Sequence, residues 1–195
     1  CAYPDALAAV WVKFKDSLIQ NGYFNRRRMP FMKMDLLIRN AILLDPETGF
    51  ETYSDVGIQN GRIALIQPTG SEMHDTRKEI NAAGAYLFPG LIDLHVHLFQ
   101  HGSGFGMNAN HLLSAGVTTA VDMGSAGYAN FAAMYDCDLA GKRLRIKSFL
   151  NLSPIGQPGK GIHEPLGDEV LDIEKMREMM ERYPGKIAGI KIRIS

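Results

Sequence analysis

Two histidines, one residue apart, end an apolar run in the middle of the chain. The stretch "GLIDLHVHLF" covers residues 90–99 and contains His95 and His97. Successive side chains of a β-strand point to opposite faces, so both imidazoles are expected on one face, together with Asp93. Two imidazoles at this spacing can converge on zinc or a similar divalent ion. The spacing also occurs in surface and structural histidines, so the position of the pair in the fold must decide.

A lysine in a later apolar segment offers a second reactive group. Lys191 lies in "GIKIRIS", which is predicted to be a strand. Burial favours the neutral amine of a lysine. A neutral amine can react with CO2 to form a carbamate, whose two oxygens can bridge two metal ions. The alternative is an ammonium group in a salt bridge at the end of the sheet, with Asp93 or Asp122 as its partner.

An arginine follows this lysine at the spacing that keeps both on one face of a strand. Arg193 lies two residues after Lys191. A guanidinium group can bind a carboxylate through two parallel hydrogen bonds. We therefore predict that Arg193 binds a substrate carboxylate, with a structural ion pair as the alternative.

Alternating strands and helices from residue 88 onward would position these groups. Predicted helices cover residues 108–116, 129–142 and 168–185, and the last one carries an apolar stripe made of Val170, Ile173, Met176 and Met180. The predicted strands are "LIDLHVH", "VTTAVDMG", "LRIKSFLNLS" and "KIAGIKIRIS". This alternation is typical of βαβ units, so the predicted fold class is α/β with a parallel sheet. Four units fit half of an eight-stranded barrel or an open doubly wound sheet. In a barrel, functional groups lie at the carboxyl ends of the strands.

The preceding residues are predicted to form a separate, β-rich unit. Residues 34–87 contain "DLLIRNAILLD" and a pair of apolar runs around Asn60 and Gly61, which predicts a tight hairpin. Residues 1–33 do not resemble this pattern and are treated as a leader of unclear role. The sequence begins without Met and ends within a predicted strand, so we expect it to be a piece of a longer chain.

Composition limits the classes of partner. The chain has 195 residues, of which 46% are hydrophobic and 22% charged, which is typical of a globular protein. Lys plus Arg and Asp plus Glu both number 21, so no basic surface for nucleic acid is expected. No apolar run approaches the ~20 residues of a membrane span. Two cysteines form no disulfide framework and fit a cytoplasmic protein. Whether the protein forms a homo-oligomer is left open.

Several of these motifs together resemble a known superfamily. The segments "DLLIRNAILLDPETG", "DVGIQNGRIALI" and "PGLIDLHVHLF" resemble the start of an amidohydrolase-superfamily enzyme. "SAGVTTAVDMGSAGYANF", "FLNLSPIG" and "GIKIRIS" are similar to its amidohydrolase/deacetylase group, which is dihydroorotase-like. The resemblance implies a small β-sandwich built from both chain ends and a metal-bearing (β/α)8 TIM-like barrel. Residues 34–87 would be the amino-terminal part of the sandwich, and residues 88–195 the first four β/α units.

The same resemblance implies a binuclear metal site. His95 and His97 would bind the more buried of two divalent ions, and Lys191, as a carbamate made with CO2, would bridge both. Zinc is the expected metal, although these ligands also accept manganese, cobalt or iron. Two further histidines and a catalytic aspartate would follow beyond Ser195. The fragment by itself is therefore expected to be inactive.

The implied reaction is hydrolysis by a metal-activated hydroxide. The expected substrate is a small carboxylate-bearing molecule whose amide or ester bond, most simply to an acetyl group, is cleaved. The alternative is a cyclic amidase of the dihydroorotase or hydantoinase kind. A non-catalytic interaction protein is a third interpretation, which the presence of His95, His97 and Lys191 disfavours.

Overall fold

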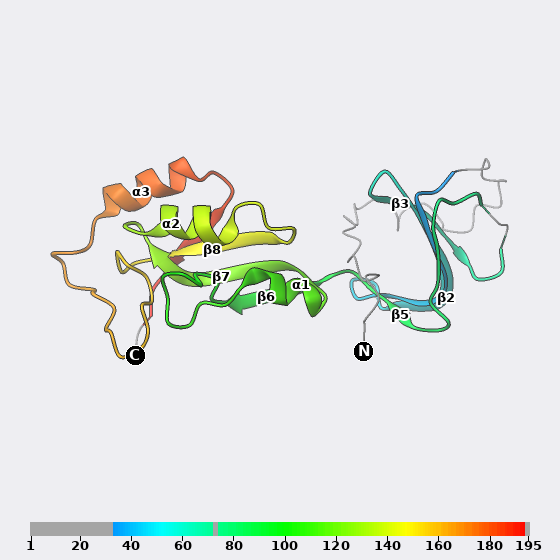
Figure 1. Cartoon of the computed structure of the whole chain (residues 1–195), viewed down its shortest axis with the longest axis horizontal. Coiled ribbons are helices and arrows are strands. Elements are labelled where there is room, and N and C mark those ends of the chain that lie inside the picture. Colours follow the sequence, from blue (N-terminus) through cyan, green and yellow to red (C-terminus); the bar gives the residue numbers. More distant parts are fainter. Residues whose placement is uncertain (1–32, 72–73, 194–195) are drawn as a thin grey trace. The chain divides into compact units, whose positions relative to one another are not determined.

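The computed structural model describes residues 33–71 and 74–193. Apart from its last residue, the predicted leader therefore lies outside the described residues. The chain divides into two compact units between Pro89 and Gly90 (Figure 1). Each unit has its own sheet, so each is described by itself.

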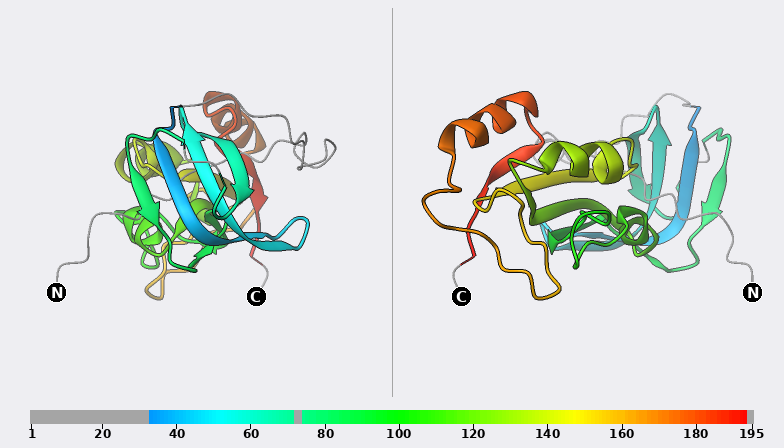
Figure 2. Two further views of the ribbon diagram at one scale, coloured as in Figure 1. Left: turned by 90° about the vertical axis from the view of Figure 1, so that its right-hand side faces the viewer. Right: turned by 60° about the vertical axis from the view of Figure 1, so that its left-hand side comes forward.

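The first unit is a sheet of five strands. Its central strand, β1, pairs with β2 in antiparallel orientation and with the short strands β4 and β5 in parallel, and β3 follows β2 at the edge (Figure 2). Positive φ angles of 52° at Asn60 and 69° at Gly61 confirm the predicted tight turn between β2 and β3. The strand bounds are Leu36–Asp45 (β1), Phe50–Gln59 (β2), Arg62–Pro68 (β3), Glu79–Asn81 (β4) and Tyr86–Leu87 (β5).

The second unit is a parallel sheet in the order β6-β7-β8-β9. All three strand pairs are parallel, so the four carboxyl ends meet at one edge of the sheet, next to the long connections after β6 and β8 (Figure 1). This arrangement confirms the predicted α/β class and matches the first four strands of a (β/α)8 barrel. The strands are Leu91–Val96 (β6), Val117–Gly127 (β7), Arg145–Asn151 (β8) and Ile187–Lys191 (β9).

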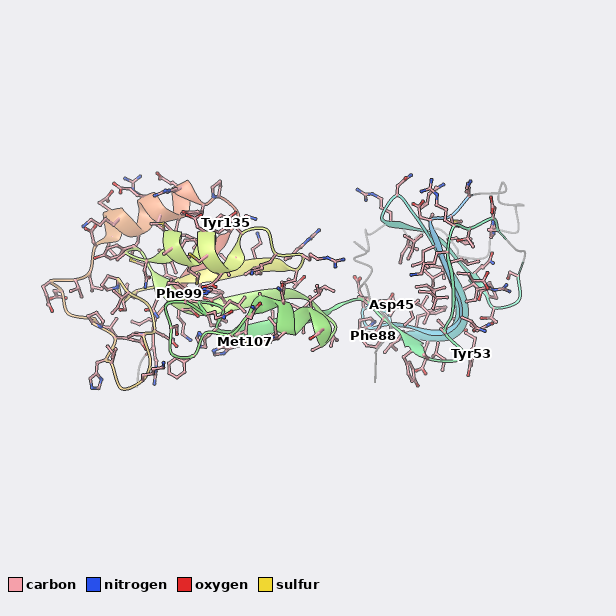
Figure 3. The ribbon with its side chains drawn as sticks, viewed as in Figure 1. Asp45, Tyr53, Phe88, Phe99, Met107 and Tyr135 are labelled. Carbon is pink, nitrogen blue, oxygen red and sulfur yellow. The ribbon has the colours of Figure 1, made fainter. Side chains whose placement is uncertain are left out.

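Helices cover one face of this sheet and close its core. The helices are α1 (Ala109–Ser114), α2 (Phe131–Met134) and α3 (Ile173–Arg182). The α2 and α3 helices lie over the same face of β7 and β8 (Figure 1). Phe131 of α2 stacks edge-on against Tyr183 after α3, with ring centroids 5.1 Å apart. Phe99, Met107 and Tyr135, labelled in Figure 3, belong to the same apolar cluster.

A π-helical segment, η1 (Tyr135–Leu139), continues α2. Its wider turn is visible in the hydrogen bond from the Ala140 N–H to the Tyr135 carbonyl, five residues back, at 2.7 Å. Asp138 in this segment is buried and accepts hydrogen bonds from His101, at 2.6 Å from Nδ1 and 3.2 Å from the main-chain N–H. The continuous helix predicted over 129–142 is therefore a short α-helix followed by a π-helical turn. Through Asp138, this turn holds the loop after β6 in place.

The last helix is shorter than the predicted span of 168–185. It begins at Ile173 because the Asp172 carboxylate accepts a hydrogen bond from the Lys175 N–H at 3.0 Å and caps the first turn. Val170 lies before the helix, and Ile173 is exposed. The buried stripe is instead centred on Met176, with Met179, Met180 and Tyr183 packed against the core.

The two outer strands of the parallel sheet expose apolar side chains. On β6, Ile92 and Leu94 are 62% and 66% exposed, although they alternate with His95 and His97 and such an apolar strand face is normally buried. Ile190 on β9 is also exposed. A strand at the edge of a sheet has a neighbour on one side only, and within the described residues no element covers these positions. Cys137 is also exposed.

Helix length bears on membrane association. The longest described helix, α3, has ten residues. Within residues 33–71 and 74–193, no helix has the length and apolar character that a membrane span requires.

Candidate metal centre

The carboxyl end of β6 brings His95 and His97 together. Their ring centroids lie 5.6 Å apart with an interplanar angle of 75°. The strand ends at Val96, and the main chain of His97 is held by the Met107 N–H, which donates to its carbonyl at 2.9 Å. The Asp93 carboxylate accepts a hydrogen bond from the His95 N–H at 3.0 Å. Both imidazoles therefore lie at the predicted end of the sheet.

A hydroxyl group sets the tautomer of His97. Ser125 Oγ donates to Asp122 Oδ2 at 2.6 Å and lies 2.9 Å from His97 Nδ1. Because the hydroxyl proton points to the carboxylate, the hydroxyl oxygen accepts the Nδ1 proton of His97. The lone pair of Nε2 is then available for a metal ion, which is how a hydrogen bond to the second ring nitrogen prepares a histidine ligand.

Asp122 is a buried carboxylate that orients other groups. Its side chain is fully buried, and it also accepts hydrogen bonds from the Leu98 N–H at 2.7 Å and the Ser125 N–H at 2.9 Å. With both oxygens occupied by neutral donors, Asp122 acts through Ser125 on His97 and fixes the backbone just after the His-x-His pair. It forms no ion pair with Lys191 within the part of the chain that the structure describes.

The environment favours the neutral form of His97. Burial lowers its pKa below the ordinary value of 6.5, although the Asp122 carboxylate acts in the opposite direction. The neighbouring His95 and Lys191 lower the pKa further, and Glu164 raises it. A metal ion binds the neutral imidazole, so this shift keeps His97 ready to act as a ligand near neutral pH.

A glycine makes room for Lys191. Lys191 is the last residue of β9 and pairs with Asn151 of β8. A Cβ at Gly124 would come within 2.8 Å of the Lys191 side chain, and Gly124 has a φ of +77°. The Asn151 amide donates to the Gly124 carbonyl at 2.9 Å and holds this turn in place. Gly124 and Asn151 are not predictable from the sequence, because only the pairing of β8 with β9 brings them next to the lysine.

Arg193 lies elsewhere than the sequence predicted. Because β9 ends at Lys191, Arg193 lies after the strand and not within it. Its guanidinium Nη1 donates to Glu164 Oε1 at 3.2 Å. The structure thus contains the structural ion pair that is the alternative to substrate binding, and the partner of Arg193, Glu164, was not predicted from the sequence.

The chemistry of these donors fits a divalent ion. Among the described residues, no cluster of three or more His, Cys, Asp and Glu side chains could hold a metal ion. His95 and His97 offer two imidazole nitrogens, a donor type that suits zinc and similar divalent ions. Lys191 would add oxygen donors to this pair only as a carbamate.

Comparison with known proteins identifies related enzymes. No family model matches the chain. A deacetylase from Agrobacterium fabrum is 36% identical over 138 residues, which are 70% of this chain and 34% of the relative. Other curated relatives are a dihydroorotase, an allantoinase and an adenine deaminase. The chain spans about a third of the length of the deacetylase and dihydroorotase relatives that it matches.

Solved structures share the fold. A dihydroorotase crystal structure has 30% sequence identity and a TM-score of 0.69, covering 82% of this chain and 42% of that one. An N-acyl-D-glutamate deacylase from Bordetella bronchiseptica, crystallised with zinc and a phosphonate inhibitor, has 21% identity and a TM-score of 0.54. That match covers 82% of this chain and 38% of the deacylase, and it indicates a common fold.

Proposed function

We propose, from the premise that this chain belongs to the amidohydrolase superfamily, that the protein is a metal-dependent hydrolase of an acyl bond. Its substrate would be a small carboxylate-bearing molecule with an amide or ester bond, most simply to an acetyl group. The observation that carries the proposal is the hydrogen-bonded chain from Asp122 through Ser125 to His97. This chain fixes the tautomer of His97 and leaves the lone pair of Nε2 free, which is the arrangement that a metal-binding histidine requires.

The proposed roles divide among three side chains. His95 and His97 would bind the more buried of two divalent ions, and Lys191, as a carbamate, would bridge it to the second. When bound, the ions supply the Lewis acidity that activates water for attack on an acyl carbonyl. Asp122 and Ser125 would keep His97 oriented, and Arg193 would hold the carboxylate of the substrate. Zinc is the metal we propose, in line with the zinc bound by the related deacylase.

Cyclic amide hydrolysis is the second candidate reaction. It is supported by the dihydroorotase and allantoinase among the relatives. A deacetylase is preferred because the relative with 36% identity carries that name. We further propose a cytoplasmic protein acting on a small molecule, with neither nucleic acid nor membrane as its partner.

Metal analysis of the full-length protein tests the proposal first. The protein is expected to hold about two zinc ions per chain after loading in bicarbonate buffer, and His97→Ala should lose them. Loading in buffer depleted of CO2, or the variant Lys191→Met, should also reduce the metal content, since both remove the carbamate. Metal content that depends on neither His97 nor Lys191 would contradict the proposed site.

Substrate comparison tests the reaction itself. N-acetylated amino acids should be hydrolysed by the metal-loaded protein, while dihydroorotate and hydantoin should not. The reverse preference would establish the cyclic amidase instead. Chelation should abolish either activity, and added zinc should restore it.

A further inference from the structure

A pocket of about 300 Å³ lies beside the candidate metal centre. It is formed by the connections after β6 and β8 and by Arg193, which lies two residues after the end of β9. Phe105, one of its lining residues, also contacts His97, with ring centroids 6.0 Å apart. Glu164, another lining residue, accepts a hydrogen bond at 3.5 Å from the side-chain amide of Asn151, which pairs with Lys191. The volume is that of a small-molecule subsite, and its walls are shared with the metal centre.

The two loops that form the pocket are joined to each other. Ser103 Oγ, in the loop after β6, donates to the Gln157 carbonyl in the loop after β8 at 2.7 Å. Gly159, with a φ of +71°, lies against Phe105, and a Cβ there would come within 3.0 Å of the ring. These contacts hold the rim in place before any ligand binds, so the pocket is largely pre-formed.

The charge of the pocket favours an anion. Two cations, Lys160 and Arg193, line it against the single carboxylate of Glu164, and His163 adds a ring N–H donor. The Glu164 side chain is only 11% exposed, whereas that of Arg193 is 53% exposed. Glu164 occupies one guanidinium nitrogen of Arg193 at 3.2 Å. A guanidinium has five N–H donors in a fork that matches a carboxylate, so Arg193 keeps donors for a second anion.

We propose that this pocket is the subsite for the carboxylate of the substrate, and that Glu164 occupies Arg193 until that carboxylate displaces it. The inference rests on the proposed hydrolase function and adds Lys160, His163 and Glu164 to it. Lys160 attracts the incoming anion, His163 can donate a hydrogen bond to it, and Arg193 binds it. Glu164 determines specificity, because the carboxylate of a ligand must bind Arg193 more tightly than the carboxylate of Glu164 does.

The displacement of Glu164 from Arg193 would exclude small free anions from the pocket. A small free anion has to compete with Glu164, which is tethered beside Arg193 and therefore has a high effective concentration. A carboxylate attached to an acyl group that is already held at the metal centre has the same advantage. The pocket therefore selects molecules in which the acyl group and the carboxylate are joined.

Equilibrium binding to the full-length, metal-loaded protein tests this subsite. The probes are N-methanesulfonylglycine and its carboxamide, which differ by one charge and lack the scissile acyl bond. Glu164→Gln should bind the acid about tenfold more tightly than the unchanged protein, because a like charge is removed. Arg193→Ala should bind the acid about 10- to 100-fold more weakly. Both variants should bind the carboxamide as the unchanged protein does.

A matched control and the opposite outcome complete the test. Arg143→Ala removes one exposed positive charge outside the pocket lining and should leave the binding of both probes unchanged. If Glu164 and Arg193 only brace the loop, both variants will weaken both probes together, which overturns the proposal. The opposite changes in Glu164→Gln and Arg193→Ala would support the subsite even if the protein hydrolysed no acyl substrate.

Discussion

Each of the two units buries a carboxylate, and they satisfy it in different ways. Asp55 in the first unit is 1% exposed, accepts a hydrogen bond from the Asn40 N–H at 2.9 Å, and lies 3.8 Å from the guanidinium of Arg39. Asn40 has a φ of +55° and lies where the pairing of β1 with β2 shifts register. Asp55 therefore stabilises an irregularity in the sheet and has a cation close by.

Asp122 in the second unit is equally buried but has only neutral donors among the described residues. These donors are two main-chain N–H groups and the Ser125 hydroxyl. Its negative charge is thus left to act on His97 through Ser125. In this chain the carboxylate with a cation nearby supports an irregularity of the sheet, whereas the one held by neutral donors contacts the candidate metal centre through Ser125.

The substitution that most directly breaks this comparison is Asp122→Asn. Its amide would turn an N–H toward a donor, so the free energy of unfolding should fall by about 1–3 kcal/mol. Metal affinity should also fall by roughly 10- to 100-fold, because the orientation of His97 is lost. Asp55→Asn should lower stability by a similar amount and leave metal affinity unchanged. Urea unfolding measures the change in stability, and metal titration measures the change in affinity. Loss of metal binding in Asp55→Asn would refute the distinction between a structural Asp55 and an Asp122 that orients His97.

Two glycines give the second test. Gly124→Ala places a Cβ 2.8 Å from the Lys191 side chain at a φ of +77°. The strain should cost about 1–2 kcal/mol, and displacement of Lys191 should lower the metal content. In the first unit, a Cβ at Gly57 would meet the flexible end of Met34 at 3.1 Å and a neighbouring Leu65. Gly57→Ala should be milder and should not alter the metal content, which elemental analysis would check.

Two buried serines give the third and smaller test. Ser125→Ala removes the link between Asp122 and His97 and should cost about 1 kcal/mol and about tenfold in metal affinity. Ser148 Oγ is buried without a hydrogen-bond partner among the described residues. Ser148→Ala should therefore change stability by less than about 0.5 kcal/mol. If the two substitutions changed the metal affinity equally, the hydroxyl of Ser125 would not contribute to the orientation of His97.

The smallest expected effect is the loss of the Asp172 helix cap at low pH. The hydrogen bonds that Asp172 accepts from Lys175 lower the pKa of this cap below its ordinary value of 3.8. Its stabilisation of α3 is present above that value and is lost as the pH falls through the lower, folded-state pKa. Circular dichroism from about pH 5 down to 2 should show less loss of helix in Asp172→Asn, whose amide caps without titrating. An identical acid response in both proteins would show that the cap does not contribute.

Local patterns predicted the elements, and long-range contacts completed the site. The alternation of strands and helices, the Asn60–Gly61 turn and the position of His95 and His97 follow from periodicity and turn chemistry. Ser125 forms a hydrogen bond with His97, which lies 28 residues earlier in the sequence, and no sequence pattern predicts such a contact. The three-residue spacing of Asp122 and Ser125 was the available signal, since such pairs often hydrogen-bond locally.

The remaining differences have local causes. The periodicity of the last helix extended it too far toward its amino end, because the cap at Asp172 ends the helix where apolar spacing alone would continue it. Arg193 was placed on a strand face because the pattern "KIRIS" continues past Lys191, where the pairing with β8 stops. The roles of Lys191 and Arg193 stay predictions that the metal and binding experiments address.

The π-turn of η1 also has a consequence for how this sequence can change in length. Removal of one residue from Tyr135–Leu139 would convert the segment to an ordinary α-helix. Each residue turns an α-helix by about 100°, so Asp138 would rotate away from His101 and release the loop after β6. Single-residue deletions should therefore be tolerated far less in this segment than in the exposed turn at 141–143. Homologous proteins that retain the histidine–aspartate pair are expected to align here without gaps.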